Sequence, residues 1–155
     1  MAVTGPVSKE RSDGLLNELP AIGPAYQALY RSLWQQSHLP VQTLALCRLR
    51  LAQLHGDHAG VSHAARDMEP GLVQALPGWP DSDAITAAEK ACLGFAEVYA
   101  MDAQAITDEL ADAVKAHHGD SGLVMLIEAL GVFDGAARLA RLWDLPGDWL
   151  EEAGA

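Results

Sequence analysis

Residues 41–68 are predicted to form two helices that follow one another without a loop. Four apolar side chains recur on one helical face before His55, namely Leu44, Cys47, Leu51 and Leu54. Gly56 suits a left-handed helix end, and Asp57 can cap a helix that starts directly after it. This junction, with its flanks from residue 48 to 67, constrains the fold more than any other segment.

The rest of the chain also shows helical spacing and helix boundary signals. Thr86 and Glu89 form a capping box, in which each side chain binds a free amide at the helix start. We expect a loop over residues 77–82 and helices over residues 24–37, 41–55, 57–68, 69–76, 86–100, 107–118 and 122–143. The pattern predicts an all-α bundle of about six to seven helices. Residues 1–20 are expected to be a flexible segment, and residues 21–155 one helical domain.

The composition excludes several classes of function. The formal net charge is −11, which disfavours nucleic acid and anionic membrane surfaces, because both carry negative charge. No apolar run approaches the roughly 18 residues of a membrane-spanning helix, and the first residues lack the apolar core of a signal peptide. We therefore expect a cytoplasmic protein. Cys47 and Cys92 are far apart in apolar surroundings and are predicted to be buried, reduced thiols.

Three segments, taken in order, resemble the carboxymuconolactone decarboxylase superfamily, and within it the alkylhydroperoxidase-like branch typified by AhpD. They are residues 46–63 with the sequence AQLHG at 52–56, residues 85–97 with ITAAEKA at 85–91, and residues 106–146 with ITDEL at 106–110. The resemblance implies an AhpD-like helical bundle that assembles into homo-oligomers. In its peroxidases a Cys-x-x-Cys pair reduces peroxide, a Glu and a His manage protons, and a lipoyl-type dithiol restores the thiols.

The catalytic residues that the resemblance implies are absent here. The Glu position is Ala45, the two Cys positions are Asp57 and Gly60, and the His position is Ala64. His63 is one residue early, which is about 100° of rotation on a helix. Peroxide reduction needs a thiolate, and none of these side chains can supply one. We therefore predict that the thiol mechanism of the family is lost. Decarboxylase members also lack the Cys pair, so lyase chemistry stays open.

A polar cluster around the junction is the candidate ligand site: His55, Asp57, His58 and His63. His63 and Asp67, four residues apart on one helix face, are the weak candidates for a metal ion. The structural interpretation is that Asp57 is a helix cap and that the histidines are exposed or packed. No cofactor is expected.

Two arginines, Arg48 and Arg50, point to different sides of their helix. One of them is expected to form a buried ion pair with one of three carboxylates: Glu89, Glu97 or Glu128. The last long helix contains small residues that allow another helix to approach closely: Gly131, Gly135, Ala136 and Ala137. We therefore predict a homo-oligomer.

Three functions remain open from the sequence. The first is an AhpD-like protein that binds a small organic ligand near Asp57 without reducing peroxides. The second is an oxidoreductase or decarboxylase-like enzyme that uses residues other than cysteine. The third is a non-catalytic structural oligomer. Whether the chain is an enzyme is not decided by its sequence.

Overall fold

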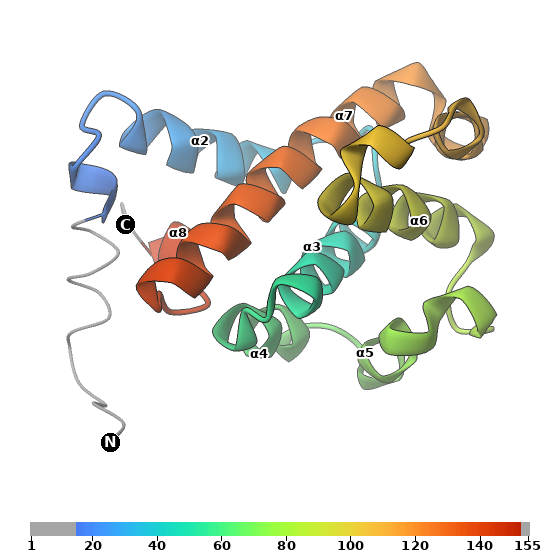
Figure 1. The fold of residues 1–155 in the computed structure, drawn as a ribbon, viewed down its shortest axis with the longest axis horizontal. Helices are drawn as coiled ribbons and strands as arrows, with labels where there is room; N and C mark the ends of the chain where they lie inside the picture. The colour runs from blue at the N-terminus through green and yellow to red at the C-terminus, as the bar shows by residue number, and fades with distance from the viewer. Residues whose placement is uncertain (1–14, 153–155) are drawn as a thin grey trace.

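A computed structural model gives the fold and describes residues 15–152. This part of the chain is helical and contains no strand (Figure 1). Its α-helices are α2 (Gly23–Leu33), α3 (Val41–His55), α4 (His58–Arg66), α5 (Pro70–Ala75), α6 (Ala87–Met101), α7 (Asp108–Trp143) and α8 (Trp149–Glu152). Two short 3₁₀-helices are η1 (Leu76–Asp81) and η2 (Ala103–Ala105). The fold class is all-α, as predicted.

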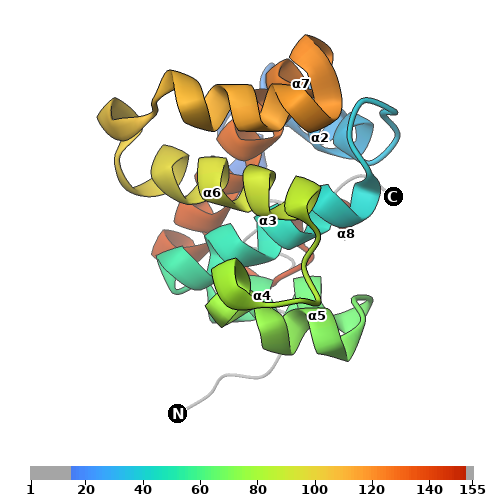
Figure 2. The same cartoon turned by 90° about the vertical axis from the view of Figure 1, so that its right-hand side faces the viewer.

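The core is built around α3. This helix packs against α6 and α7 on one side and α4 on the other, and Figure 2 shows α4 and α5 on the opposite side of α3 from α6. Four of its leucines are fully buried: Leu44, Leu46, Leu49 and Leu51. Leu126 and Leu130 of α7 and Leu93 of α6 join the same core.

The helix junction after α3 forms as predicted. Gly56 ends the helix with a left-handed φ of 66°, and the Asp57 side chain accepts a hydrogen bond from the Gly60 amide at the start of α4. The capping box of Thr86 and Glu89 is present at the start of α6. These boundaries depend on contacts within one helical turn, which is why the sequence predicts them.

Two expected boundaries were wrong. The first helix ends at Leu33, not Ser37, because the Gln36 side chain organises the next turn: it accepts from the amides of His38 and Leu39 and donates to the Leu39 carbonyl. The segment predicted as a loop at residues 77–82 largely forms η1, and Pro77 lies in the first turn of this helix, where proline is favoured.

The long helix α7 contains both of the helices predicted after residue 106. They are separated at Gly119, whose φ of 69° and ψ of −176° are not helical. A glycine adopts this backbone conformation without a steric penalty. The predicted division at residue 119 is therefore present as an interruption within one element.

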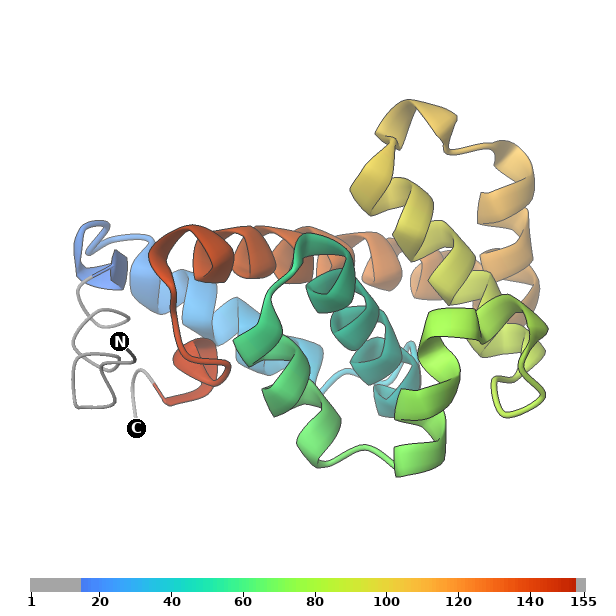
Figure 3. The same cartoon turned by 60° about the horizontal axis from the view of Figure 1, so that its bottom comes forward.

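The chain after α7 folds back onto the body of the protein, and α8 lies beside α2 (Figure 3). Leu145, Trp149 and Leu150 are buried. The segment passes so close to α4 that a Cβ atom at Gly147 would lie 2.3 Å from the Ala59 carbonyl oxygen and 2.4 Å from the Cβ of His63. A side chain at this position would therefore force the tail away from α4.

Most of the expected flexible segment, residues 1–14, lies outside the described residues, as do residues 153–155. Leu15 and Leu16 are described, and they pack against the core. Within the described part of the chain, no helix has the length and apolar character needed to cross a bilayer.

Candidate functional site

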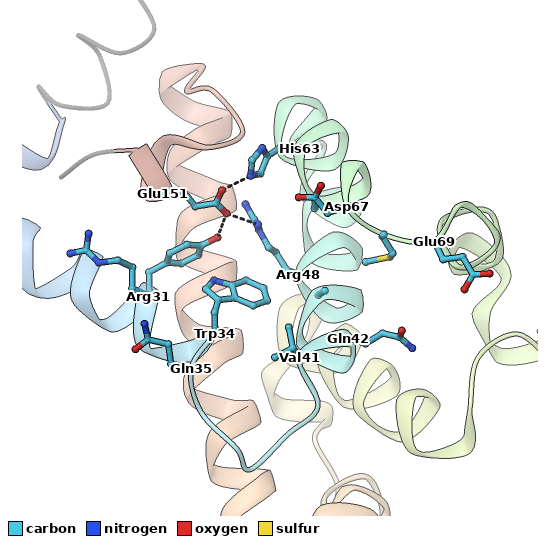
Figure 4. A pocket seen from close by; sticks show the side chains of 14 residues that line it. Arg31, Trp34, Gln35, Val41, Gln42, Arg48, His63, Asp67, Glu69 and Glu151 are labelled. Atoms are coloured by element: carbon cyan, nitrogen blue, oxygen red, sulfur yellow. Dashed lines mark hydrogen bonds and ion pairs between the residues drawn. The ribbon is translucent and has the colours of Figure 1, made fainter. Parts of the chain in front are cut away.

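A pocket of about 670 Å³ opens between α2, α3, α4 and the C-terminal α8 (Figure 4). Its apolar lining includes Tyr30, Trp34, Val41, Ala45, Ala64 and Met68, and its polar lining includes Arg31, Gln35, Gln42, Arg48, His63, Asp67, Glu69 and Glu151. A concave, largely apolar site with a few convergent polar groups is typical of small-molecule binding sites.

Aromatic rings form one wall of this pocket. Trp34 is stacked on Phe133 with ring centroids 5.6 Å apart, and Tyr30 packs edge-on against Trp34 at 6.0 Å. The Arg48 guanidinium lies 5.7 Å from the Tyr30 ring centroid and 5.9 Å from that of Trp34. These cation–π contacts hold the positive charge of Arg48 beside the aromatic wall of the pocket.

The Glu151 carboxylate accepts hydrogen bonds from three side chains that come from three different helices. Arg48 Nη1 lies 3.1 Å and the Tyr30 hydroxyl 2.9 Å from Glu151 Oε1, and His63 Nε2 lies 2.6 Å from Oε2. Arg48 Nη2 also donates to the Gly147 carbonyl at 3.2 Å. Figure 4 shows the Arg48 and His63 side chains pointing toward Glu151. We call Tyr30, Arg48 and His63 the donor triad.

The donor triad controls the ionisation of Glu151. Burial alone would raise the pKa of Glu151, but Arg48 and the hydrogen bonds from Tyr30 and His63 outweigh this effect and lower it. Burial raises the pKa of Tyr30, so its hydroxyl stays protonated and able to donate. Glu151 is thus a charged acceptor surrounded by donors. The other ring nitrogen of His63, Nδ1, is buried and has no hydrogen-bond partner among the described residues.

The four polar residues proposed from the sequence are not gathered at one site. His55 Nε2 lies 2.5 Å from Asp134 Oδ1 on α7, Asp57 is a buried helix cap, and His58 is exposed. His63 alone of the four lines the larger pocket. The junction therefore distributes these side chains over several directions, since successive residues of a helix point about 100° apart.

The four positions at which the family resemblance implies catalytic residues lie along two adjoining cavities. Ala45 and Ala64 line the larger pocket, whereas Asp57 and Gly60 line a cavity of about 30 Å³ that shares Tyr30 and Arg48 with it. Asp57 and Gly60 depend on each other, because a Cβ at Gly60 would lie 2.1 Å from Asp57 Oδ2. At the two positions where the family resemblance implies thiols, Asp57 is a helix cap and Gly60 leaves the space for it.

Neither cysteine is placed for thiol chemistry. Cys47 and Cys92 are buried and free, and neither lines the pocket. Burial, with smaller contributions from Cys92 and Glu89, raises the pKa of the Cys47 thiol well above its ordinary value. Burial raises the pKa of Cys92 to about 12. Both groups are therefore thiols at neutral pH, and the thiol form is a poor nucleophile.

The remaining sequence predictions have different outcomes. Arg50 forms the expected ion pair with Glu97, at 2.6 Å, and Glu97 also accepts from the Trp79 indole. Within residues 15–152, no group of three or more His, Cys, Asp or Glu side chains is arranged to hold a metal ion. His63, one of the two weak metal candidates, is bonded to Glu151 instead of Asp67.

Of the donor triad, sequence reasoning named only His63 as a candidate site residue, and it missed Tyr30, Arg48 and Glu151. Glu151, the partner of Arg48, is 103 residues away and was not among the three carboxylates considered for the arginines. One signal was available: Trp149-Leu150 is an apolar pair inside an acidic tail, and such a pair favours docking onto the core. Docking of this pair carries Glu151 to the pocket.

Comparison with known proteins supports the fold. No family model matches the chain, and no curated protein matches it. The crystal structure of a protein of unknown function from Agrobacterium tumefaciens, suggested by its description to be the antioxidant defence protein AhpD, matches with a TM-score of 0.74 and 21% identity. The match covers 83% of this chain and 91% of that protein. The chain therefore has an AhpD-like all-α fold.

Proposed function

We propose that this protein binds a small organic molecule in the pocket of the donor triad and does not reduce peroxides by a thiol mechanism. The supporting observation is the lining of the pocket. Where the family resemblance implies a catalytic Glu and His, the pocket is lined by Ala45 and Ala64, which remove the proton-transfer groups and leave space. This assignment moves the expected ligand from the neighbourhood of Asp57 to that of Arg48 and His63.

The pocket can be tested with two probes of the same shape, the neutral 2-naphthamide and the anionic 2-naphthoate, in calorimetric and NMR titrations. Ala45→Phe fills the pocket and should weaken binding of either probe at least about tenfold, or 1.4 kcal/mol. Val124→Phe, on an exposed face of α7 outside the pocket, is the matched control and should change affinity less than about twofold. The proposal would be overturned if the protein bound neither probe. It would also be overturned if Ala45→Phe and the unmodified protein bound the probes with equal affinity.

The absence of thiol chemistry has its own test. An organic hydroperoxide and a dithiol donor should be consumed no faster with the protein than without it. Cys47→Ser and Cys92→Ser should leave this background unchanged, since both thiols are buried and protonated. Turnover that disappears in either variant would show that the family's redox role persists through another cysteine.

A further inference from the structure

Glu151 makes the contacts that an anionic ligand would make. Its carboxylate accepts from a guanidinium, a phenol and an imidazole, which is a set of donors suited to a carboxylate. Its side chain is 38% exposed, whereas that of Arg48 is 18% exposed. The acceptor is therefore the more accessible partner, and it lies at the edge of a pocket large enough for a molecule far bigger than one carboxylate.

Two of the three donors, Arg48 and Tyr30, are held in place by contacts that do not involve Glu151. Arg48 retains the Gly147 carbonyl and the faces of Tyr30 and Trp34. Tyr30 is fixed by its packing against Trp34 and Phe133. If the Glu151 side chain rotated away, the positive charge and the phenol would remain where they are. A prearranged set of donors binds a new acceptor without the cost of ordering flexible side chains.

Glu151 is anchored less firmly than its donors. It belongs to α8, which has only four residues, Trp149–Glu152, close to the C-terminal end of the chain. Trp149 and Leu150 anchor this helix in the core, so α8 can stay docked while the exposed Glu151 side chain changes rotamer. A ligand carboxylate that takes its place therefore need not unfold any part of the protein.

We infer that the donor triad is a recognition site for a ligand carboxylate and that Glu151 is its internal occupant, which the ligand displaces. This inference rests on the proposed function and names the class of ligand. The carboxylate is joined to an apolar body, because the pocket beyond the triad is lined by Trp34, Val41, Ala45, Ala64 and Met68. Asp67 and Glu69 line the same pocket and disfavour a second anionic group close to them.

The same pair of probes tests this inference by calorimetric titration at neutral pH. In Glu151→Gln the internal occupant loses its charge, and the affinity for 2-naphthoate should rise about tenfold while that for 2-naphthamide changes less than about twofold. Asp148→Asn removes one negative charge from the same tail outside the pocket, and it should leave both affinities nearly unchanged. Arg48→Met should abolish the preference for 2-naphthoate over 2-naphthamide. The milder change Tyr30→Phe should reduce this preference about threefold.

The outcomes separate the inference from the proposed function. Binding of 2-naphthamide to every variant shows that the pocket is intact and that the variants fold. If naphthamide then binds but Glu151→Gln strengthens naphthoate no more than Asp148→Asn does, the inference is overturned and the proposed function stands. If neither probe binds to any variant, the proposed function fails, and the inference fails with it.

Discussion

Arg48 and Glu151 show how single residues acquire their roles from several weak contacts. The guanidinium has one nitrogen on the Gly147 carbonyl and another on the Glu151 carboxylate, with two aromatic rings beside it. A partly exposed ion pair of this kind contributes little to stability by itself. Its importance is geometric, because it fixes a cation at the end of an apolar pocket.

Asp57 and Gly60 provide a prediction at the scale of single residues. Asp57→Ala should reduce the free energy of unfolding by about 0.5–2 kcal/mol through loss of the helix cap. Gly60→Ala should not stabilise the protein that retains Asp57, because the new Cβ would displace the capping carboxylate. In the Asp57→Ala background the same change should stabilise by about 0.5–1 kcal/mol, the helix preference of alanine over glycine. Urea unfolding of all four proteins measures this coupling, and additive effects would contradict it.

Glu151 provides a second residue-scale prediction, in its dependence on pH. Its folded-state pKa lies below the ordinary 4.5, so the folded protein binds this proton less readily than the unfolded chain. The resulting stabilisation is present above the ordinary pKa of glutamate and is lost as pH falls through the lower folded value. The thermal unfolding temperature of the unmodified protein should exceed that of Glu151→Gln at neutral pH. This difference should disappear in acid; a difference that stays constant down to strongly acidic pH would exclude the effect.

At the scale of elements, α8 and the turn before it complete the pocket. The long helix α7 ends at Trp143, and the chain then reverses across α4 so that α8 reaches α2. Two buried side chains, Trp149 and Leu150, hold α8 in the core. This short element therefore supplies one wall of the site although it has too few residues to form an independent helix.

Gly147→Ala should detach this element from α4. The added Cβ would meet the Ala59 carbonyl oxygen and the His63 Cβ at distances shorter than any van der Waals contact. We expect faster amide hydrogen exchange over residues 145–152. In the Gly147→Ala background, Glu151→Gln should no longer change the affinity for 2-naphthoate. Gly78→Ala is the matched control, because no atom lies within 4 Å of its added Cβ. Unchanged exchange in Gly147→Ala would mean that the tail crosses α4 with more room than the structure shows.

At the scale of the whole molecule, apolar side chains remain on the surface. Leu142 is 75% exposed and Trp143 50% exposed at the end of α7, next to an apolar groove of about 620 Å³ that also includes Leu19 and Ile22. Such a surface patch favours association, and the acidic net charge of −11 keeps non-specific association weak.

We propose, on this basis and because Gly131 and Gly135 of α7 line the same groove, that the protein is a homo-oligomer. Light scattering coupled to size exclusion should give a mass that is a multiple of 16.5 kDa at micromolar concentration. Leu142→Glu with Trp143→Glu should reduce this mass, because charge at an apolar interface is costly to bury. Val124→Glu, on another exposed part of α7, is the comparison. A monomer at micromolar concentration would remove the proposal.

The sequence alone was enough to predict the helical class, the α3–α4 junction, the capping of α4 and α6 and the interruption at Gly119. Each depends on residues within about one helical turn, whose spacing and backbone preferences are visible in the chain. The sequence also included the pairing of Arg50 with Glu97 among its predictions, because Glu97 was one of the three glutamates considered. The sequence shows Asp57 and Gly60 where the family resemblance implies two cysteines, but it does not show the contact that links Asp57 to Gly60.

Only the tertiary structure decided where the pocket lies and which polar groups serve it. Glu151 meets Tyr30, Arg48 and His63 across 121, 103 and 88 residues. No local pattern specifies such contacts, because they result from the packing of α2, α3, α4 and α8 around a shared core. The polar residues between His55 and His63 lie apart in the structure for a related reason. Helix rotation and packing, not proximity in sequence, determine which side chains face a common space.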